Sequence, residues 1–222
     1  NIIMYPRILL NTSKIIKKYE DKYLNNTLIV SPIGGQFSTN YPDININYNS
    51  LEINENKVVG KYDVNLCYTM NNQTKIHNLE LIIEPKFNYS VDSVKISYYD
   101  TIRSVKPYIN AYGGIFSLNE VINGITIDEY TGVIKMSNVD LGIYKLLVNY
   151  TYNNVTCSTY YNIESVATFK YSQNLNITYL ENYEINSIKP IVYPMNGKFS
   201  SNNIIEDEDS GILKYNNLLP NT

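Results

Sequence analysis

The sequence predicts an all-β protein built from tandem β-sandwich domains, of which the third is incomplete. Two observations lead to this prediction: landmarks that return about every 80 residues, and short alternating strand patterns inside each copy. A period near 80 residues is too long for a solenoid repeat and suits a small β-sandwich. The chain has 222 residues, 44% hydrophobic and 18% charged, so it can bury a core.

Five landmarks define the repeat. Phe37, Phe116 and Phe199 each lie in a Gly-x-Phe-Ser context, 79 and 83 residues apart. Four further pairs recur at offsets of 79 to 83 residues: "SVKP" at Ser104 with "SIKP" at Ser187, Val59–Thr74 with Leu141–Thr156, Lys86–Ser90 with Thr168–Ser172, and Asp128–Lys135 with Asp207–Lys214. Their shared order divides the chain into a first sandwich at residues 1–85, with an additional leading N-terminal strand, a second sandwich at 86–167 and a partial third at 168–222.

Alternating apolar residues predict the strands within each repeat. One face of Tyr62–Tyr68 carries Tyr62, Val64, Leu66 and Tyr68, and one face of Tyr144–Tyr150 carries Tyr144, Leu146, Val148 and Tyr150. Such strands, separated by Gly, Asn, Asp and Pro, are typical of an antiparallel sandwich. The best helix candidate, Ser13–Lys22, is interpreted as a strand, because its equivalent near Val94–Arg103 has a strand and turn pattern.

A turn with two special residues recurs between two of the strands. Asp128 is positioned to cap this turn through its carboxylate, and Gly132 supplies the positive φ that a tight turn requires. A Gly-x-Tyr sequence follows it. Its tyrosines, Tyr62 and Tyr144, are candidates for a corner in which a buried ring donates its hydroxyl to a nearby backbone carbonyl.

The stretch "GITIDEYTGVIKMSNVDLGIYKLLVNYTYNNVTCSTYYNI" (Gly124–Ile163) resembles the Ig-like repeats of large surface proteins, which are related to cadherin-like repeats. The resemblance covers the second repeat and extends through Leu213 in the third, whereas Ile44–Ile53 of the first lacks the Thr-Gly. It implies seven-stranded Greek-key sandwiches in tandem, which act as stalks, fibres or adhesive surfaces. This is an argument from fold, not from a site.

Several functions are excluded by what the sequence lacks. A net charge of −3 and the absence of a basic stripe argue against nucleic-acid binding. No apolar run reaches the roughly 18 residues needed to span a bilayer. The single histidine, His77, has no nucleophile or orienting acid near it in sequence, and it is interpreted as a surface or edge-strand residue. We therefore expect no enzyme, no cofactor and no membrane insertion.

Metal binding is not predicted either. Cys67 and Cys157 fall in different repeats at non-equivalent positions, so two free buried thiols are expected rather than a disulfide. The resemblance makes Ca²⁺ the metal candidate at the seams between repeats. The seams expected at "SVKP" and "SIKP", with Pro107 and Pro190, are basic, and the acidic cluster Glu206–Asp209 matches a solvated hairpin loop.

Glycosylation is the modification that the sequence supports best. Asn-x-Ser/Thr sequons occur at Asn11, Asn25, Asn72, Asn88, Asn149, Asn154 and Asn176. Because Asn is abundant, several of these arise from composition alone. Asn72 and Asn154 stand out, since they are repeat-equivalent and both lie in an "NNxT" turn, where a bulky glycan has room.

The third repeat stops before its last strands, which leaves three interpretations of the assembly open. The chain is part of a longer polypeptide, only part of the repeat is ordered, or another chain supplies the missing strands, with the leading segment Asn1–Asn11 as a donor. The favoured function is a non-enzymatic fibre or stalk on a cell or virion surface, self-assembling head to tail. The alternatives are an adhesin that binds a host glycan or protein, and accessory domains of a larger secreted enzyme.

Overall fold

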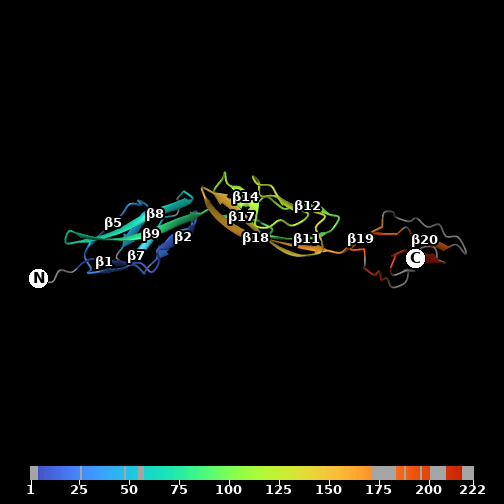
Figure 1. Ribbon diagram of the computed structural model, residues 1–222, viewed down its shortest axis with the longest axis horizontal. Helices are drawn as coiled ribbons and strands as arrows, with labels where there is room; N and C mark the ends of the chain where they lie inside the picture. The colour runs from blue at the N-terminus through green and yellow to red at the C-terminus, as the bar shows by residue number, and fades with distance from the viewer. Residues whose placement is uncertain are drawn as a thin grey trace.

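The computed structural model of the chain describes residues 5–25, 27–47, 49–54, 58–171, 184–187, 189–195, 197–200 and 209–216. Within these ranges the chain is all-β, without a helix, and thus without one long and apolar enough to cross a membrane. The strands form three groups that follow one another along the long axis of the molecule (Figure 1). We call these groups the first, second and third repeats.

Nine strands form each of the first two repeats, and four are described in the third. The first repeat comprises β1 (Arg7–Leu9), β2 (Lys14–Lys18), β3 (Tyr23–Asn25), β4 (Ile29–Ser31), β5 (Gln36–Thr39), β6 (Ile44–Asn47), β7 (Ser50–Ile53), β8 (Gly60–Met70) and β9 (Gln73–Glu84). The second comprises β10 (Phe87–Asn88), β11 (Ser93–Ser97), β12 (Thr101–Arg103), β13 (Tyr108–Ile109), β14 (Ile115–Leu118), β15 (Ile125–Ile127), β16 (Ile134–Ser137), β17 (Gly142–Tyr152) and β18 (Val155–Val166). The third comprises β19 (Thr168–Lys170), β20 (Glu184–Asn186), β21 (Ile191–Tyr193) and β22 (Lys214–Asn216).

The second repeat is a two-layered sandwich. One sheet has the order β11-β18-β17-β14, and the other is formed by β12-β16-β15 together with the pair β10-β13. β12 and β13 act as one strand interrupted at Ser104–Pro107, so the second repeat has eight strands, one more than the sequence resemblance implies. The first repeat has the same order, with β2-β9-β8-β5 opposite β3-β7-β6 and β1-β4.

One kind of strand pairing, present in both the first and the second repeat, differs from the antiparallel sandwich predicted from the sequence. β2 runs parallel to β9 and β11 runs parallel to β18, whereas all other pairs are antiparallel in the described part of the chain. The period-2 pattern of a strand is the same in both cases, so it does not reveal the direction of the partner.

Two long hairpins, β8–β9 and β17–β18, supply the longest strands of the first and second repeats. Each turns through two asparagines with positive φ: 51° and 60° at Asn71 and Asn72, 48° and 57° at Asn153 and Asn154. Two successive positive φ angles are the signature of the type I′ turn, whose twist matches that of the flanking strands, and asparagine tolerates them better than other side-chain-bearing residues. The "NNxT" turns are therefore required by the backbone.

The core of each complete repeat lies between its two sheets. In the second repeat it includes Ile96 and Leu146 from one sheet and Ile109, Ile134 and Met136 from the other. The predicted alternation is confirmed where it was clearest: Val64, Leu66 and Tyr68 in β8, and Leu146, Val148 and Tyr150 in β17, are all at most 1% exposed. Tyr62 and Tyr144, at the start of the same faces, are only half-buried.

Three sequence-based interpretations concern the ends and joins of the repeats. Ser13–Lys22 contains a strand, β2, as predicted. The leading segment is not an additional strand: β1 pairs with β4, with Ile8 opposite Val30, just as β10 pairs with β13. The placement of "SVKP" and "SIKP" at the seams is wrong. "SVKP" lies inside the second repeat between β12 and β13, and "SIKP" follows β20 in the third.

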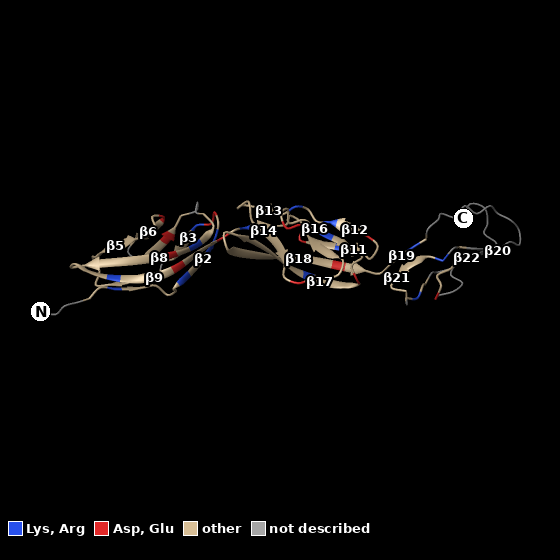
Figure 2. Cartoon of the chain, turned by 45° about the horizontal axis from the view of Figure 1, so that its top comes forward, with Lys and Arg blue, Asp and Glu red and all other residues tan. Residues whose placement is uncertain are grey.

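Charged residues of both signs are interspersed along the strands (Figure 2). Many pair across neighbouring strands, as Lys14 does with Glu80 at 3.3 Å and Lys95 with Glu164 at 2.7 Å. These lysines lie on β2 and β11, which end their sheets, and charge on an edge strand discourages pairing with another sheet. The exposed pairs contribute little to stability.

Candidate functional site: the seams between repeats

The hairpin loop that repeats in the sequence forms a closed turn in the structure. Asp128 accepts hydrogen bonds through Oδ1 from the backbone N–H of Thr131 at 2.8 Å and of Tyr130 at 3.1 Å. These bonds, led by the one from the Thr131 amide, hold the pKa of Asp128 below its usual value. Gly132 has a φ of 72°, and a Cβ there would lie 2.7 Å from Pro107 and 2.9 Å from Phe116.

Tyr89, which was not among the predicted site residues, connects this loop to the end of the first strand of its repeat. The Tyr89 hydroxyl donates to the Gly132 carbonyl at 2.5 Å, and in the third repeat the Tyr171 hydroxyl donates to the Gly211 carbonyl at 2.6 Å. Gly211 has the same positive φ, 67°, and a Cβ there would lie 2.7 Å from Phe199. The repeated Gly-x-Phe-Ser, Phe-x-Tyr-Ser and Thr/Ser-Gly landmarks thus belong to one packing unit.

Two kinds of tyrosine link the loops of a repeat. The Tyr62 hydroxyl donates to the Val58 carbonyl at 2.7 Å, and the Tyr144 hydroxyl donates to the Asp140 carbonyl at 2.9 Å, each four residues back in the chain. A second, fully buried tyrosine holds the Gly-Gly loop. The Tyr150 hydroxyl donates to the Ala111 carbonyl at 2.5 Å and accepts from the Gly114 N–H at 2.9 Å. Tyr68 makes the equivalent pair of bonds in the first repeat, with Pro32 and Gly35.

The first seam, where the first repeat meets the second, has a small apolar core of its own. Val59 and Ile82 of the first repeat pack with Ala111 and Val155 of the second, and all four are at most 9% exposed. Tyr19 and Tyr152 pack against the edge of this cluster. Because Ile82 lies between the inward-facing Leu81 and Ile83 of β9, its side chain is on the outer face of its sheet, and its burial is due to the neighbouring repeat.

Side-chain amides add polar contacts around this apolar cluster. Asn153, at the tip of the β17–β18 hairpin, donates from Nδ2 to the Val59 carbonyl at 3.1 Å. Asn110 donates from Nδ2 to the Tyr19 carbonyl at 3.4 Å, while its Oδ1 accepts from the backbone N–H of Lys86 at 2.7 Å. The seam is therefore held by backbone carbonyls of one repeat and asparagine side chains of the next.

The carboxylates near the first seam are paired with lysines. Lys18 contacts Glu84 at 2.6 Å, and Lys86 contacts Asp21 at 3.6 Å. Across the described ranges, no group of three or more His, Cys, Asp or Glu side chains could hold a metal ion. Of the acidic cluster at 206–209, only Asp209 is among the described residues.

The second seam, between the second and third repeats, is made mainly of tyrosines. The rings of Tyr98 and Tyr193 stack face to face with centroids 3.5 Å apart and an interplanar angle of 12°. The Tyr193 hydroxyl donates to Asp140 Oδ1 at 2.7 Å, and the Tyr99 hydroxyl donates to the Val192 carbonyl at 3.2 Å. Tyr98 and Tyr193 correspond in the repeat to Tyr19 and Asn110 of the first seam.

Raising the pH is expected to break the Tyr193–Asp140 contact. The hydrogen bond to Asp140, followed by burial and by the charge of Asp140, raises the pKa of Tyr193 from 10.0 to about 12. A raised pKa means that the folded seam favours the neutral phenol, so its contribution is complete below pH 10 and is lost as the pH passes 12. The difference in phenolate absorbance between the wild type and Tyr193→Phe should titrate near 12.

The control for this prediction is Asp140→Asn, which keeps an oxygen acceptor but removes the charge. In that variant the component assigned to Tyr193 should titrate closer to 10. A component that titrates at 10 in the wild type, or that is insensitive to Asp140→Asn, would show that the contact does not form in solution.

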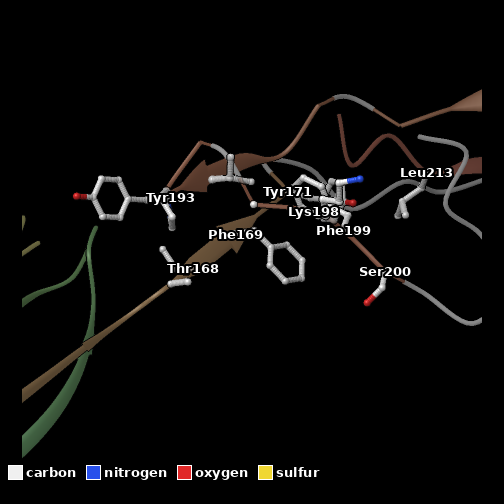
Figure 3. A pocket seen from close by; sticks show the side chains of 12 residues that line it. Thr168, Phe169, Tyr171, Tyr193, Lys198, Phe199, Ser200 and Leu213 are labelled. Atoms are coloured by element: carbon white, nitrogen blue, oxygen red, sulfur yellow. The ribbon is translucent and has the colours of Figure 1, made fainter. Parts of the chain in front are cut away.

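The third repeat has an apolar groove where the second repeat has a closed core. β19–β21 and β20–β22 repeat the pairings β10–β13 and β12–β16, but no described residue forms a counterpart of β17 or β18. Phe169 is 60% exposed, whereas the equivalent Phe87 is 7% exposed. Phe169, Tyr171, Val192, Phe199 and Leu213 are among the residues that line a cavity of about 440 Å³ (Figure 3).

The sequons lie in different environments. Asn72 and Asn154 are exposed at the hairpin tips, and the hydroxyls of their Thr74 and Thr156 pair with Thr69 and Thr151 of the opposite strand, both at 2.8 Å. Asn11 and Asn88 are exposed, Asn25 and Asn149 are half-buried, and Asn149 Oδ1 accepts from Ser158 at 2.6 Å. Asn176 lies outside the described residues. Glycosylation at any of them remains a prediction.

The remaining candidate residues are the two cysteines and the histidine. Both cysteines are free, but only Cys157 is buried, and Cys67 is half-buried. Burial raises the pKa of the Cys157 thiol to about 11, which makes it a poor nucleophile. His77 lies half-buried within β9, with Nε2 3.4 Å from the Thr12 carbonyl.

The comparisons with known proteins find similar structures but no family. No family model matches the sequence, and no curated protein matches it. Among solved structures, the chain is similar to human protocadherin-24 EC1-2 (13% identity, 74% of this chain and 99% of that chain, TM-score 0.29). It is also similar to Drosophila N-cadherin EC1-3 (11%, 73% and 68%, 0.34) and to the titin domains z1z2 solved in complex with telethonin (11%, 75% and 98%, 0.33).

The assignment to tandem β-sandwiches rests on the strand order and pairing of the chain itself.

Proposed function

We propose that the chain is a non-enzymatic structural protein, a semi-rigid tandem stalk or fibre on a cell or virion surface. The proposal rests on the packing of the first seam. Its buried cluster of Val59, Ile82, Ala111 and Val155, together with the bond from Asn153 to Val59, restricts the angle between two repeats. A chain whose repeats served only as independent binding modules would not need a packed seam.

The surroundings of the seam favour a spacer as well. The join between β9 and β10 is only Pro85 and Lys86, without a flexible Gly/Ser linker. The hairpin tip that contacts the preceding repeat uses Asn153, which the type I′ turn requires in any case. The second repeat thus contacts the repeat before it through a residue that its own hairpin turn favours, which suits an extended array.

Copies of the chain are proposed to contact one another head to tail by β-strand addition. The groove in the third repeat supports this part of the proposal, because its apolar lining is suited to cover by strands from a second copy. β1 is paired within its own repeat in this structure, so an exchange that used the leading segment would first have to displace β1 from β4.

Small-angle X-ray scattering at low concentration tests the stalk. A strand of 12 residues such as β18 is about 40 Å long, so three repeats in line give a radius of gyration of about 30 Å or more. A compact domain of 222 residues has roughly 17 Å. A value near the compact one would contradict the stalk.

Assembly is tested separately by electron microscopy and light scattering over increasing concentration. The proposal predicts linear chains of copies that form as the concentration rises. Isolated monomers at high concentration would contradict head-to-tail assembly while leaving the stalk itself in place.

A further inference from the structure

The stacked tyrosines of the second seam are arranged for a covalent reaction. Tyr98 at the end of β11 and Tyr193 in β21 belong to different repeats, yet their rings lie 3.5 Å apart and almost parallel. In Figure 3 the ring of Tyr193 points away from Phe169 and the groove and toward the green ribbon of the second repeat. The groove therefore does not explain the orientation of this ring.

The hydroxyl of Tyr193 has a base in place. It donates to Asp140 Oδ1 at 2.7 Å, and a carboxylate at this distance accepts the phenolic proton as an electron leaves the ring. Asp140 is also held in place through its backbone, because its carbonyl accepts a hydrogen bond from the Tyr144 hydroxyl at 2.9 Å. One-electron oxidation of Tyr193 is thus favoured over that of a solvent-exposed tyrosine.

We propose that Tyr98 and Tyr193 form an intramolecular dityrosine cross-link when the protein meets a one-electron oxidant of the peroxidase and hydrogen peroxide class. Each phenol loses one electron and one proton, the proton of Tyr193 to Asp140 and that of Tyr98 to water. The two radicals then couple between the ring carbons ortho to the hydroxyls. The hydrogens on these carbons are lost as protons while the oxygens regain protons, and one hydrogen peroxide is reduced to two waters.

The geometry selects this pair over its neighbours. When two such radicals couple, the new carbon–carbon bond forms perpendicular to both rings, so stacked rings are the reactive arrangement. Tyr99 is edge-on to both partners, at 85° and 5.2 Å to Tyr98 and at 77° and 6.5 Å to Tyr193. At the first seam the same two positions hold Tyr19 and Asn110, which cannot form this bond.

The cross-link would lock the second and third repeats together. Among the described residues, the contacts at this seam are the stack of Tyr98 on Tyr193 and the hydrogen bonds of Tyr99 and Tyr193, without a buried apolar cluster like that of the first seam. A covalent bond there would supply the restraint that packing supplies at the first seam. The reaction requires a single copy only, so it does not depend on the proposed assembly.

The test treats dilute full-length chain with a peroxidase and limiting hydrogen peroxide, followed by dityrosine fluorescence and peptide mass spectrometry of the monomer fraction. The expected main product is a peptide pair that joins Tyr98 to Tyr193 with the loss of two hydrogens. Tyr98→Phe and Tyr193→Phe should abolish this pair, whereas the matched controls Tyr99→Phe and Tyr112→Phe should leave it. Asp140→Asn should slow its formation about tenfold or more, a modest loss for a positioned base.

The proposal is overturned if the monomer carries no Tyr98–Tyr193 pair while other tyrosines are oxidised. It is also overturned if dityrosine forms mainly between copies, or if Tyr98→Phe leaves the fluorescence yield of the monomer unchanged.

Discussion

Replacing Gly114 by Ala is expected to lower the free energy of unfolding of the second repeat by about 3 kcal/mol or more. A Cβ at this position would lie 2.4 Å from the Thr151 carbonyl oxygen and 2.6 Å from the Tyr150 ring. Neither neighbour is free to move, because Thr151 is paired with Thr156 in the hairpin and Tyr150 is packed on Phe116. A shift of the loop would also break the bond from the Gly114 N–H to Tyr150.

Denaturant unfolding followed by tyrosine fluorescence measures this effect. Gly35→Ala should be similarly destabilising in the first repeat, where the Cβ would lie 2.5 Å from the Thr69 carbonyl and 2.6 Å from Tyr68. Gly197→Ala is the control, because the nearest atom to its Cβ is 3.9 Å away. If Gly114→Ala and Gly197→Ala unfold at the same denaturant concentration, the packing of Tyr150 against this loop is wrong.

Replacing Ile82 by Glu is expected to uncouple the first two repeats while leaving both folded. Ile82 is 7% exposed in the apolar cluster of the first seam. A carboxylate cannot be buried there without losing its hydration, and the buried isoleucine itself is worth about 1.5–3 kcal/mol. The second repeat has Glu164 at the equivalent position of β18, half-exposed and paired with Lys95, so the sandwich itself accepts a glutamate at this site.

Scattering and NMR relaxation measure the uncoupling. Wild-type repeats should tumble together, whereas in Ile82→Glu the rotational correlation time of each repeat should fall and the distribution of end-to-end distances should broaden. Ile76→Glu is the matched control, since Ile76 faces the same side of β9 but is 53% exposed. Equal rigidity in the two variants would mean that the seam contributes nothing to the shape of the chain.

The sequence predicted the repeats, the alternation of the long hairpin strands and the hairpin chemistry of Asp128 and Gly132, because these depend on residues close together in the chain. It did not predict the seams. Which surfaces of two domains meet depends on their relative orientation, and "SVKP" looked like a linker because it contains a proline. In the structure Ser104 instead pairs with Ile134, through its own N–H at 2.8 Å and through its hydroxyl at 2.9 Å.

The tyrosine contacts could be predicted only in part from the sequence. Tyr89 and Tyr171 were visible as part of the repeated Lys86–Ser90 and Thr168–Ser172 landmarks, and Tyr68 and Tyr150 as part of the alternating strands. Their partners are backbone carbonyls about 36 to 43 residues away, at Pro32, Ala111, Gly132 and Gly211. A carbonyl carries no sequence signal, so only the tyrosine half of each bond could have been recognised.

The parallel pairing of β11 with β18 decides how the second repeat would respond to a pull along its length. The chain enters this repeat through β10, continues into β11 and leaves from the end of β18. β11 and β18 are joined over five residue pairs, from Ser93–Asn162 to Ser97–Val166. Tension applied through the two neighbours acts along these strands and loads their hydrogen bonds in shear, all at once. Bonds loaded together fail at a higher force than bonds opened one by one, so the same parallel edge that the sequence concealed would make each complete repeat resistant to stretching.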